Sequence, residues 1–131
     1  MAISKRGKLS AKEFNLIRQH TLQSVALISP VEFLKPVLPI ILHHHEKYDG
    51  SGYPSGFKKE QIPLGARVLS VVDAFEAMVQ GRPYRSSLSI DAALDELVKY
   101  SGSQFDPKIV DAFVSLAFQK KFRKLLSSLK T

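Results

Sequence analysis

Apolar residues recur at the spacing of α-helix turns along most of this chain, and proline or glycine interrupts the pattern between segments. The first segment runs to Pro30, and its apolar face consists of Phe14, Ile17, Leu22, Val25 and Ile28. Ser10 followed three residues later by Glu13 has the spacing of a capping box, which predicts where this helix begins. Repeated segments of this kind predict an all-α fold.

A second helix is expected over residues 31–46, with an inward face formed by Leu34, Val37, Leu38, Ile41 and Leu42. Pro36 suits its first turns, whereas Pro39 requires a kink or a later start, because proline lacks an N–H and clashes with the preceding turn. A third helix is expected over residues 66–79. Its β-branched beginning would also suit a buried strand, but apolar residues continue at helical spacing beyond Asp73, which favours a helix.

Capping signals predict two further helices. Ser87 or Ser89 is suited to cap a helix that ends near Gly102, and Asp106 followed by Pro107 is a start signal for another. Residues 102–107 are therefore interpreted structurally, as a helix stop, a buried phenylalanine and a helix start. We expect a single domain, residues 1–131, with about five to six helices, a core over about residues 9–118 and a basic tail over residues 119–131. The pattern leaves open whether that tail is helical.

Composition excludes several classes of protein. The chain has 131 residues and no cysteine, which rules out disulfides, thiolate zinc sites and thiol catalysis. Its net charge of +7 is concentrated near the two ends without the aromatic interleaving that stacks bases, so we expect solvated ends and no specific nucleic-acid binding. Residues 1–8 are basic with no apolar segment behind them, and no stretch is long enough to span a bilayer. We therefore expect no signal peptide, no membrane association and a cytoplasmic location.

Three consecutive histidines, His43, His44 and His45, run into Glu46 and a glycine-rich turn over residues 50–54. Imidazole is the commonest metal ligand among side chains, and a tight, backbone-rich loop beside it suits a phosphate or sugar. Adjacent helical residues point about 100° apart, so His44 and His45 would serve two different ions of a two-metal site rather than one ion. The alternative is that one of these histidines is packed and the other solvated.

Other candidate residues have an ordinary structural explanation as well. Asp73 lies in an apolar stretch, where a carboxylate needs a partner, and metal binding is as good an explanation as a bond to Arg67 or to a helix end. His20, on the polar edge of the first helix, is by itself a surface or core histidine. Arg82 and Arg85 suit the capture of a phosphate, but they also suit a solvated turn.

Together these residues resemble the HD-GYP family, bacterial phosphodiesterases that linearise cyclic di-GMP and belong to the HD superfamily of metal-dependent phosphohydrolases. The resemblance covers about residues 7–116, where the matching motifs follow one another in order. They are Gly7-Lys8-Leu9-Ser10 with His20, His44-His45-Glu46 with Asp49-Gly50-Ser51-Gly52-Tyr53-Pro54, Ile62-Pro63-Leu64-Gly65-Ala66-Arg67, Val72-Asp73-Ala74-Phe75-Glu76-Ala77-Met78, Arg82-Pro83-Tyr84-Arg85 and Gly102-Ser103-Gln104-Phe105-Asp106-Pro107.

The resemblance implies a fold and a set of roles. The fold is an HD-domain-like helical bundle. For a divalent metal such as Fe or Mn, the resemblance implies ligands at His20, His44, His45 and Asp73. For the cyclic dinucleotide and its phosphates, it implies contacts at Tyr53, Arg82 and Arg85. Arg85 stands where relatives often have lysine, which keeps the charge but alters the donor geometry.

In relatives, the His-Asp pair that names the superfamily lies upstream of the position of Gly7, and residues 1–9 hold no histidine and no acidic residue. Because metal sites are sensitive to the loss of ligands, we expect an N-terminally truncated domain with a weak metal site, no intact catalytic set and little or no catalysis. The alternatives are a non-catalytic module that binds cyclic di-GMP or a partner protein, and a structural all-α remnant. Absent helices would also expose part of the core and favour a homodimer or another protein partner.

Overall fold

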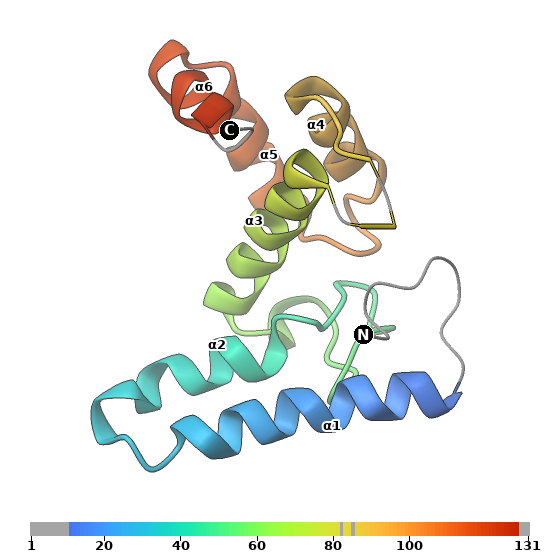
Figure 1. Ribbon diagram of the computed structural model, residues 1–131, viewed down its shortest axis with the longest axis vertical. Helices are drawn as coiled ribbons and strands as arrows, with labels where there is room; N and C mark the ends of the chain where they lie inside the picture. The colour runs from blue at the N-terminus through green and yellow to red at the C-terminus, as the bar shows by residue number, and fades with distance from the viewer. Residues whose placement is uncertain (1–10, 82, 85, 129–131) are drawn as a thin grey trace. The chain divides into compact units, whose positions relative to one another are not determined.

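The computed structural model describes residues 11–81, 83–84 and 86–128, and this part of the chain is built from helices (Figure 1). Its α-helices are α1 (Ala11–Ile28), α2 (Leu38–His43), α3 (Leu64–Gln80), α4 (Ile90–Lys99), α5 (Pro107–Ala117) and α6 (Lys120–Ser127). Two 3₁₀ helices, η2 (Glu32–Val37) and η3 (Lys59–Gln61), complete the regular elements, and the described residues contain no β-strand. The predicted all-α class and the number of helices are confirmed.

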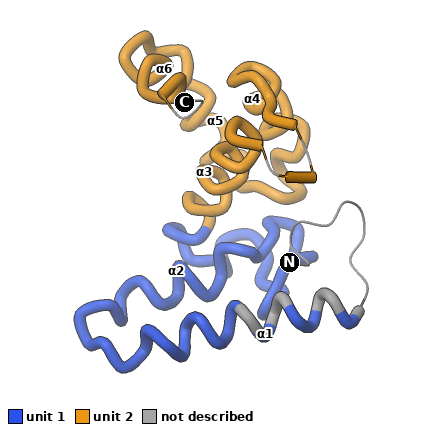
Figure 2. Tube along the Cα trace, in the orientation of Figure 1, with its two compact units in different colours: residues 1–66 blue, residues 67–131 orange. Residues whose placement is uncertain are grey.

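The chain divides into two compact units, residues 1–66 and residues 67–131 (Figure 2). Among the described residues, no helix combines the length and the hydropathy that crossing a bilayer requires.

In the first unit, α1 packs against α2, and the two lie side by side (Figure 1). The helix predicted over residues 31–46 is wrong in its extent, because a 3₁₀ segment occupies Glu32–Val37 and α2 ends at His43. Pro39 stands within the first two positions of α2, where its missing N–H has no intrahelical partner to lose. With Pro36 in the 3₁₀ segment and Pro39 at the start of α2, the α-helical part begins only at Leu38 and has six residues. The capping box at Ser10 lies outside the described residues.

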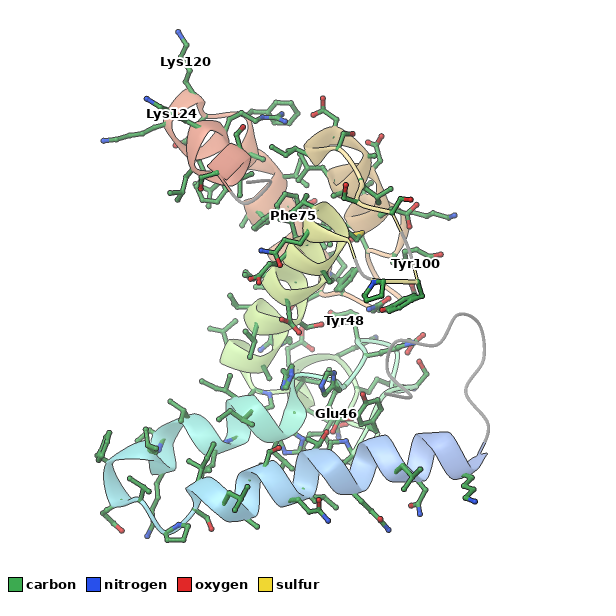
Figure 3. All side chains as sticks on the ribbon, viewed as in Figure 1. Glu46, Tyr48, Phe75, Tyr100, Lys120 and Lys124 are labelled. Carbon is green, nitrogen blue, oxygen red and sulfur yellow. The ribbon has the colours of Figure 1, made fainter. Side chains whose placement is uncertain are left out.

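The segment that follows α2 is an ordered loop attached to the helix end by one buried carboxylate. Glu46 is 2% exposed, and its carboxylate accepts hydrogen bonds from His43 Nδ1 at 2.9 Å, from the Ser55 N–H at 2.9 Å and from the Phe57 N–H at 3.0 Å. We call these four residues the Glu46 network (Glu46 is labelled in Figure 3). Hydrogen bonds to a charged acceptor are stronger than neutral ones, so the network fixes the path of the loop.

Close backbone packing and a local turn shape the tip of the same loop. A Cβ at Gly52 would lie 2.5 Å from the His45 carbonyl oxygen and 2.6 Å from the Glu46 carbonyl carbon, so only glycine fits there. Asp49 Oδ1 accepts from the Ser51 N–H at 2.9 Å and from the Ser51 hydroxyl at 2.6 Å. These bonds lower the pKa of Asp49, which keeps its carboxylate ionised and the turn closed.

The second unit has a continuous apolar core to which all four of its helices contribute, including Val71, Phe75, Leu97, Val110 and Leu126. The Phe75 ring lies 5.0 Å from the Phe113 ring, and Phe113 meets Phe122 edge-on at 5.9 Å between centroids. This chain of rings connects α3, α5 and α6. The sequence left open whether the basic tail is helical; within its described part, Lys120–Ser127 forms α6, and the Leu126 side chain belongs to the core.

A buried ion pair also stabilises the second unit. Asp106 is 2% exposed and caps α5, because its Oδ1 accepts from the Lys108 N–H at 2.9 Å. Its other oxygen, Oδ2, accepts from Arg67 Nη1 of α3 at 2.7 Å. The predicted helix start at Asp106-Pro107 is thus confirmed, and Ser89 is the residue that caps α4.

Loss of the Asp106 carboxylate should destabilise the protein strongly. Asp106→Ala removes a helix cap and the carboxylate that pairs with a mostly buried guanidinium, so we expect the free energy of unfolding to fall by on the order of 3 kcal/mol. Asp91→Ala is the matched control, because Asp91 is 81% exposed in its pair with Arg123 and such pairs contribute about 1 kcal/mol or less. Urea unfolding of both variants measures the difference, and equal losses would contradict the assignment.

Loss of the Glu46 carboxylate should release the loop. In Glu46→Ala the Ser55 and Phe57 amides lose a charged acceptor that is itself buried, so we expect the free energy of unfolding to fall by on the order of 3 kcal/mol and exchange at these two amides to accelerate. Glu60→Ala, an exposed carboxylate in the same loop, should change stability by no more than about 0.5 kcal/mol. Amide hydrogen exchange measured by NMR tests both. Unchanged protection at Ser55 and Phe57 in Glu46→Ala would show that the network does not hold the loop.

Candidate metal and phosphate site

His44 stands directly after α2, where it is the C-terminal capping residue. Its Nδ1 lies 2.7 Å from the Ile41 carbonyl oxygen. A carbonyl oxygen can only accept, so Nδ1 carries the ring proton and Nε2 presents its lone pair. Metal-ligating histidines usually have one ring N–H bonded in this way, which fixes the tautomer and the ring orientation. The geometry of His44 therefore fits a metal ligand that binds through Nε2.

His45 and Tyr53 form the adjoining part of the site. The His44 and His45 rings lie 3.9 Å apart between centroids, in the turn that directly follows α2. The His45 ring also stacks on the Tyr53 ring, with 5.1 Å between centroids and 20° between the ring planes. The expectation that the two histidines diverge as helical neighbours is thus wrong for their rings. The structure brings His44, His45 and Tyr53 together.

Burial raises the pKa of Tyr53 to about 12. Its phenol stays protonated at neutral pH and retains a hydroxyl proton to donate to an oxygen acceptor such as a phosphate. Because the ring also covers one side of the His45 imidazole, Tyr53 holds the second histidine and presents a polar group beside it.

The remaining candidate residues do not join His44, His45 and Tyr53 among the described contacts. Asp73 lies on α3 of the second unit with its side chain exposed, so it is not the buried carboxylate that its apolar neighbours suggested. Arg67 pairs with Asp106 and not with Asp73. His20 belongs to α1, but its side chain lies outside the described part of the structure, as do Arg82 and Arg85. Among the described side chains, no three His, Asp or Glu groups come together as a metal-binding cluster.

Sequence reasoning missed two members of the site. Glu46 positions the loop, and His43 both donates to Glu46 and stacks on Phe57 at 4.5 Å. The signal was present: a carboxylate three residues after a histidine at a helix end is within reach of that imidazole. The three histidines therefore have different roles. His43 is buried against Phe57 and holds the Glu46 carboxylate, whereas His44 and His45 are partly exposed at the start of the loop.

Comparisons with known proteins place these residues in a family. A family model described as an HD domain matches residues 1–109. The cyclic di-GMP phosphodiesterase response regulator RpfG of Xanthomonas campestris is 43% identical over 112 residues, which cover 84% of this chain and 30% of that protein. A cyclic di-GMP phosphodiesterase of Thermotoga maritima is 38% identical over 116 residues, 86% of this chain and 31% of the relative.

A solved structure agrees with the sequence matches. The cyclic GMP-AMP specific phosphodiesterase of Vibrio cholerae superposes with a TM-score of 0.75 at 25% identity, covering 99% of this chain and 33% of that one. The chain thus spans about a third of the length of these relatives. HD-domain phosphohydrolases are metal-dependent, and the Nε2 lone pair of His44 is suited to a metal. The family match and the fold agree, and this chain belongs to the HD domain family.

Proposed function

We propose that this chain forms part of a metal-dependent phosphodiesterase module that acts on cyclic dinucleotides of the cyclic di-GMP type. The observation that carries the proposal is the orientation of His44, whose Nδ1 is bonded to a carbonyl so that Nε2 is left for a metal. His45 beside it, with the Tyr53 hydroxyl and the glycine-rich loop, supplies further groups suited to a phosphodiester. The curated relatives hydrolyse cyclic di-GMP, according to their names.

The residues of this chain would take part in four ways. His44 and His45 would hold a divalent cation such as Fe or Mn, with His20 and Asp73 as the further ligands that the family resemblance implies. When bound, the cation would supply Lewis-acid polarisation of the phosphate and a water of lowered pKa. Tyr53 would donate its hydroxyl proton to a phosphate oxygen, and Arg82 and Arg85 would pair with the phosphates. The Glu46 network would keep the loop in place during binding.

A metal-binding measurement tests the role of His44. We expect Co²⁺ to give a visible absorption band with the purified chain, and His44→Ala to weaken binding at least tenfold, because a direct ligand is worth at least as much as an outer-shell partner. Lys47→Ala, an exposed neighbour, is the control and should bind as the unaltered chain does. Circular dichroism checks that both variants remain folded. Equal affinity in His44→Ala would exclude His44 as a ligand.

A turnover assay tests catalysis by the chain alone. The 131 residues contain no His-Asp dipeptide, the pair that completes the metal site in the superfamily. We therefore expect the purified chain with Mn²⁺ or Fe²⁺ to hydrolyse cyclic di-GMP little or not at all above the His44→Ala background. Binding of cyclic di-GMP without hydrolysis would favour the non-catalytic signalling module. Robust hydrolysis would contradict the expectation of impaired catalysis.

A further inference from the structure

The C-terminal helix of the second unit, α6, has one face in the core and one face in solvent. Leu126 is buried, and Phe122 packs against the same core. On the opposite side of the helix Lys120, Lys121 and Lys124 are exposed, and Figure 3 shows Lys120 and Lys124 extending away from the ribbon. We call these three lysines the basic face of α6. The helix therefore presents positive charge outward.

Contacts of Arg123 fix which side of α6 faces outward. Its Nη1 donates to Asp91 Oδ1 of α4 at 2.9 Å, and its Nε donates to the Ala117 carbonyl oxygen at the end of α5 at 3.0 Å. Arg123 is thus engaged within the protein. The ion pairs found among the described residues do not include the basic face, and α6 contains no acidic residue. The charge of the basic face is therefore available to a partner.

Two large apolar side chains are exposed near this charge. Phe118, two residues before α6 begins, is 76% exposed, and Leu125 is 64% exposed. Leu125 follows Lys121 by four residues, so both lie on the same side of the helix. Apolar side chains gain free energy by leaving water, whereas lysines favour a place where anions meet their charge. The surface therefore suits a partner that offers anions and an apolar environment together.

We propose that the basic face, together with Phe118 and Leu125, docks on the surface of an anionic phospholipid bilayer. Anionic headgroups attract clustered lysines, and the region just beneath the headgroups takes up phenylalanine and leucine side chains. A nucleic acid would match the lysines, but it offers no apolar interior to Leu125. A second copy of this chain would bring the same lysines together across a two-fold axis, where they repel one another. The bilayer matches both the charge and the apolar side chains.

The docking is weak and mainly electrostatic. The apolar face of α6 is already used in the core, so the bilayer receives the Phe118 and Leu125 side chains and not a whole apolar face. Attraction between exposed charges is screened by salt, which makes the docking sensitive to ionic strength. Surface docking needs no spanning helix, so the proposal departs from the expectation of no membrane association, which rested on the lack of a spanning segment. It does not depend on the proposed function, because neither a metal nor a substrate takes part.

Sedimentation with lipid vesicles tests the docking. The purified chain is mixed with vesicles of phosphatidylcholine alone, or of phosphatidylcholine and phosphatidylglycerol at about 2:1, at low and at physiological salt. We expect the chain to sediment with the anionic vesicles, to stay in solution with the neutral ones, and to be released as the salt concentration rises. Absence of binding to the anionic vesicles, or equal binding to both kinds, would overturn the proposal.

Two matched triple variants locate the docking surface. The first carries Lys120→Gln, Lys121→Gln and Lys124→Gln. It should lower the affinity for anionic vesicles about a hundredfold, because each lysine at such a surface contributes about fivefold. The control removes the same charge from exposed lysines elsewhere, by Lys12→Gln, Lys47→Gln and Lys108→Gln, and should lower the affinity no more than about threefold. Circular dichroism checks that both variants remain folded, and equal losses in the two would refute docking through α6.

A single apolar change separates a bilayer from other anionic partners. Phe118→Ser keeps every charge, so its binding to soluble polyphosphate should equal that of the unaltered chain. Its affinity for anionic vesicles should fall about tenfold, because the aromatic ring no longer leaves water on docking. Unchanged vesicle binding in Phe118→Ser would contradict docking into the bilayer surface and would favour an acidic protein or a nucleic acid as the partner of the basic face.

Discussion

The bonding of the Glu46 carboxylate is the constraint on which the candidate metal and phosphate site depends. A carboxylate that is 2% exposed must have its oxygens satisfied, and here an imidazole and two backbone N–H groups satisfy them. The two loop amides in turn gain a charged acceptor, which is a stronger partner than a neutral one. A polar group in the interior thus gives a glycine-rich segment one defined path, although that segment has few apolar side chains to bury.

The backbone just before Glu46 determines where the histidines lie relative to the end of α2. Pro36 lies in the 3₁₀ segment and Pro39 in the first two positions of α2, which ends at His43, so that the next two histidines follow in a turn. At that point the Ile41 carbonyl, which a longer helix would have used, is free to orient the His44 ring. The unsatisfied carbonyls of a helix terminus therefore act as outer-shell partners for a ligand. Loop and helix end together form one site.

The sequence predicted helix boundaries correctly where they depend on hydrogen bonds between near neighbours. It did not predict features that depend on contacts between residues far apart in the chain. Ser89 and Asp106 cap helices as expected, because a cap is a bond to a residue two or three positions away. The extent of α2 was wrong because the apolar spacing continued through prolines that allow only a 3₁₀ segment. Asp73 was expected to be buried from its neighbours in the sequence, but its place on the helix surface is exposed. The Arg67–Asp106 pair joins residues 39 positions apart, and no periodicity reveals it.

The different roles of the three histidines matter when homologues are identified by a sequence motif. If one histidine of the triplet were deleted, the printed sequence would still read His-His-Glu before the glycine-rich turn, and a motif search would still succeed. Leucine would then occupy the place three residues before Glu46, and the carboxylate would lose its imidazole donor. Two homologues with the same motif can therefore differ in whether an imidazole bonds to the carboxylate that holds the loop. The residue directly before the motif, His43 in this chain, distinguishes the two cases.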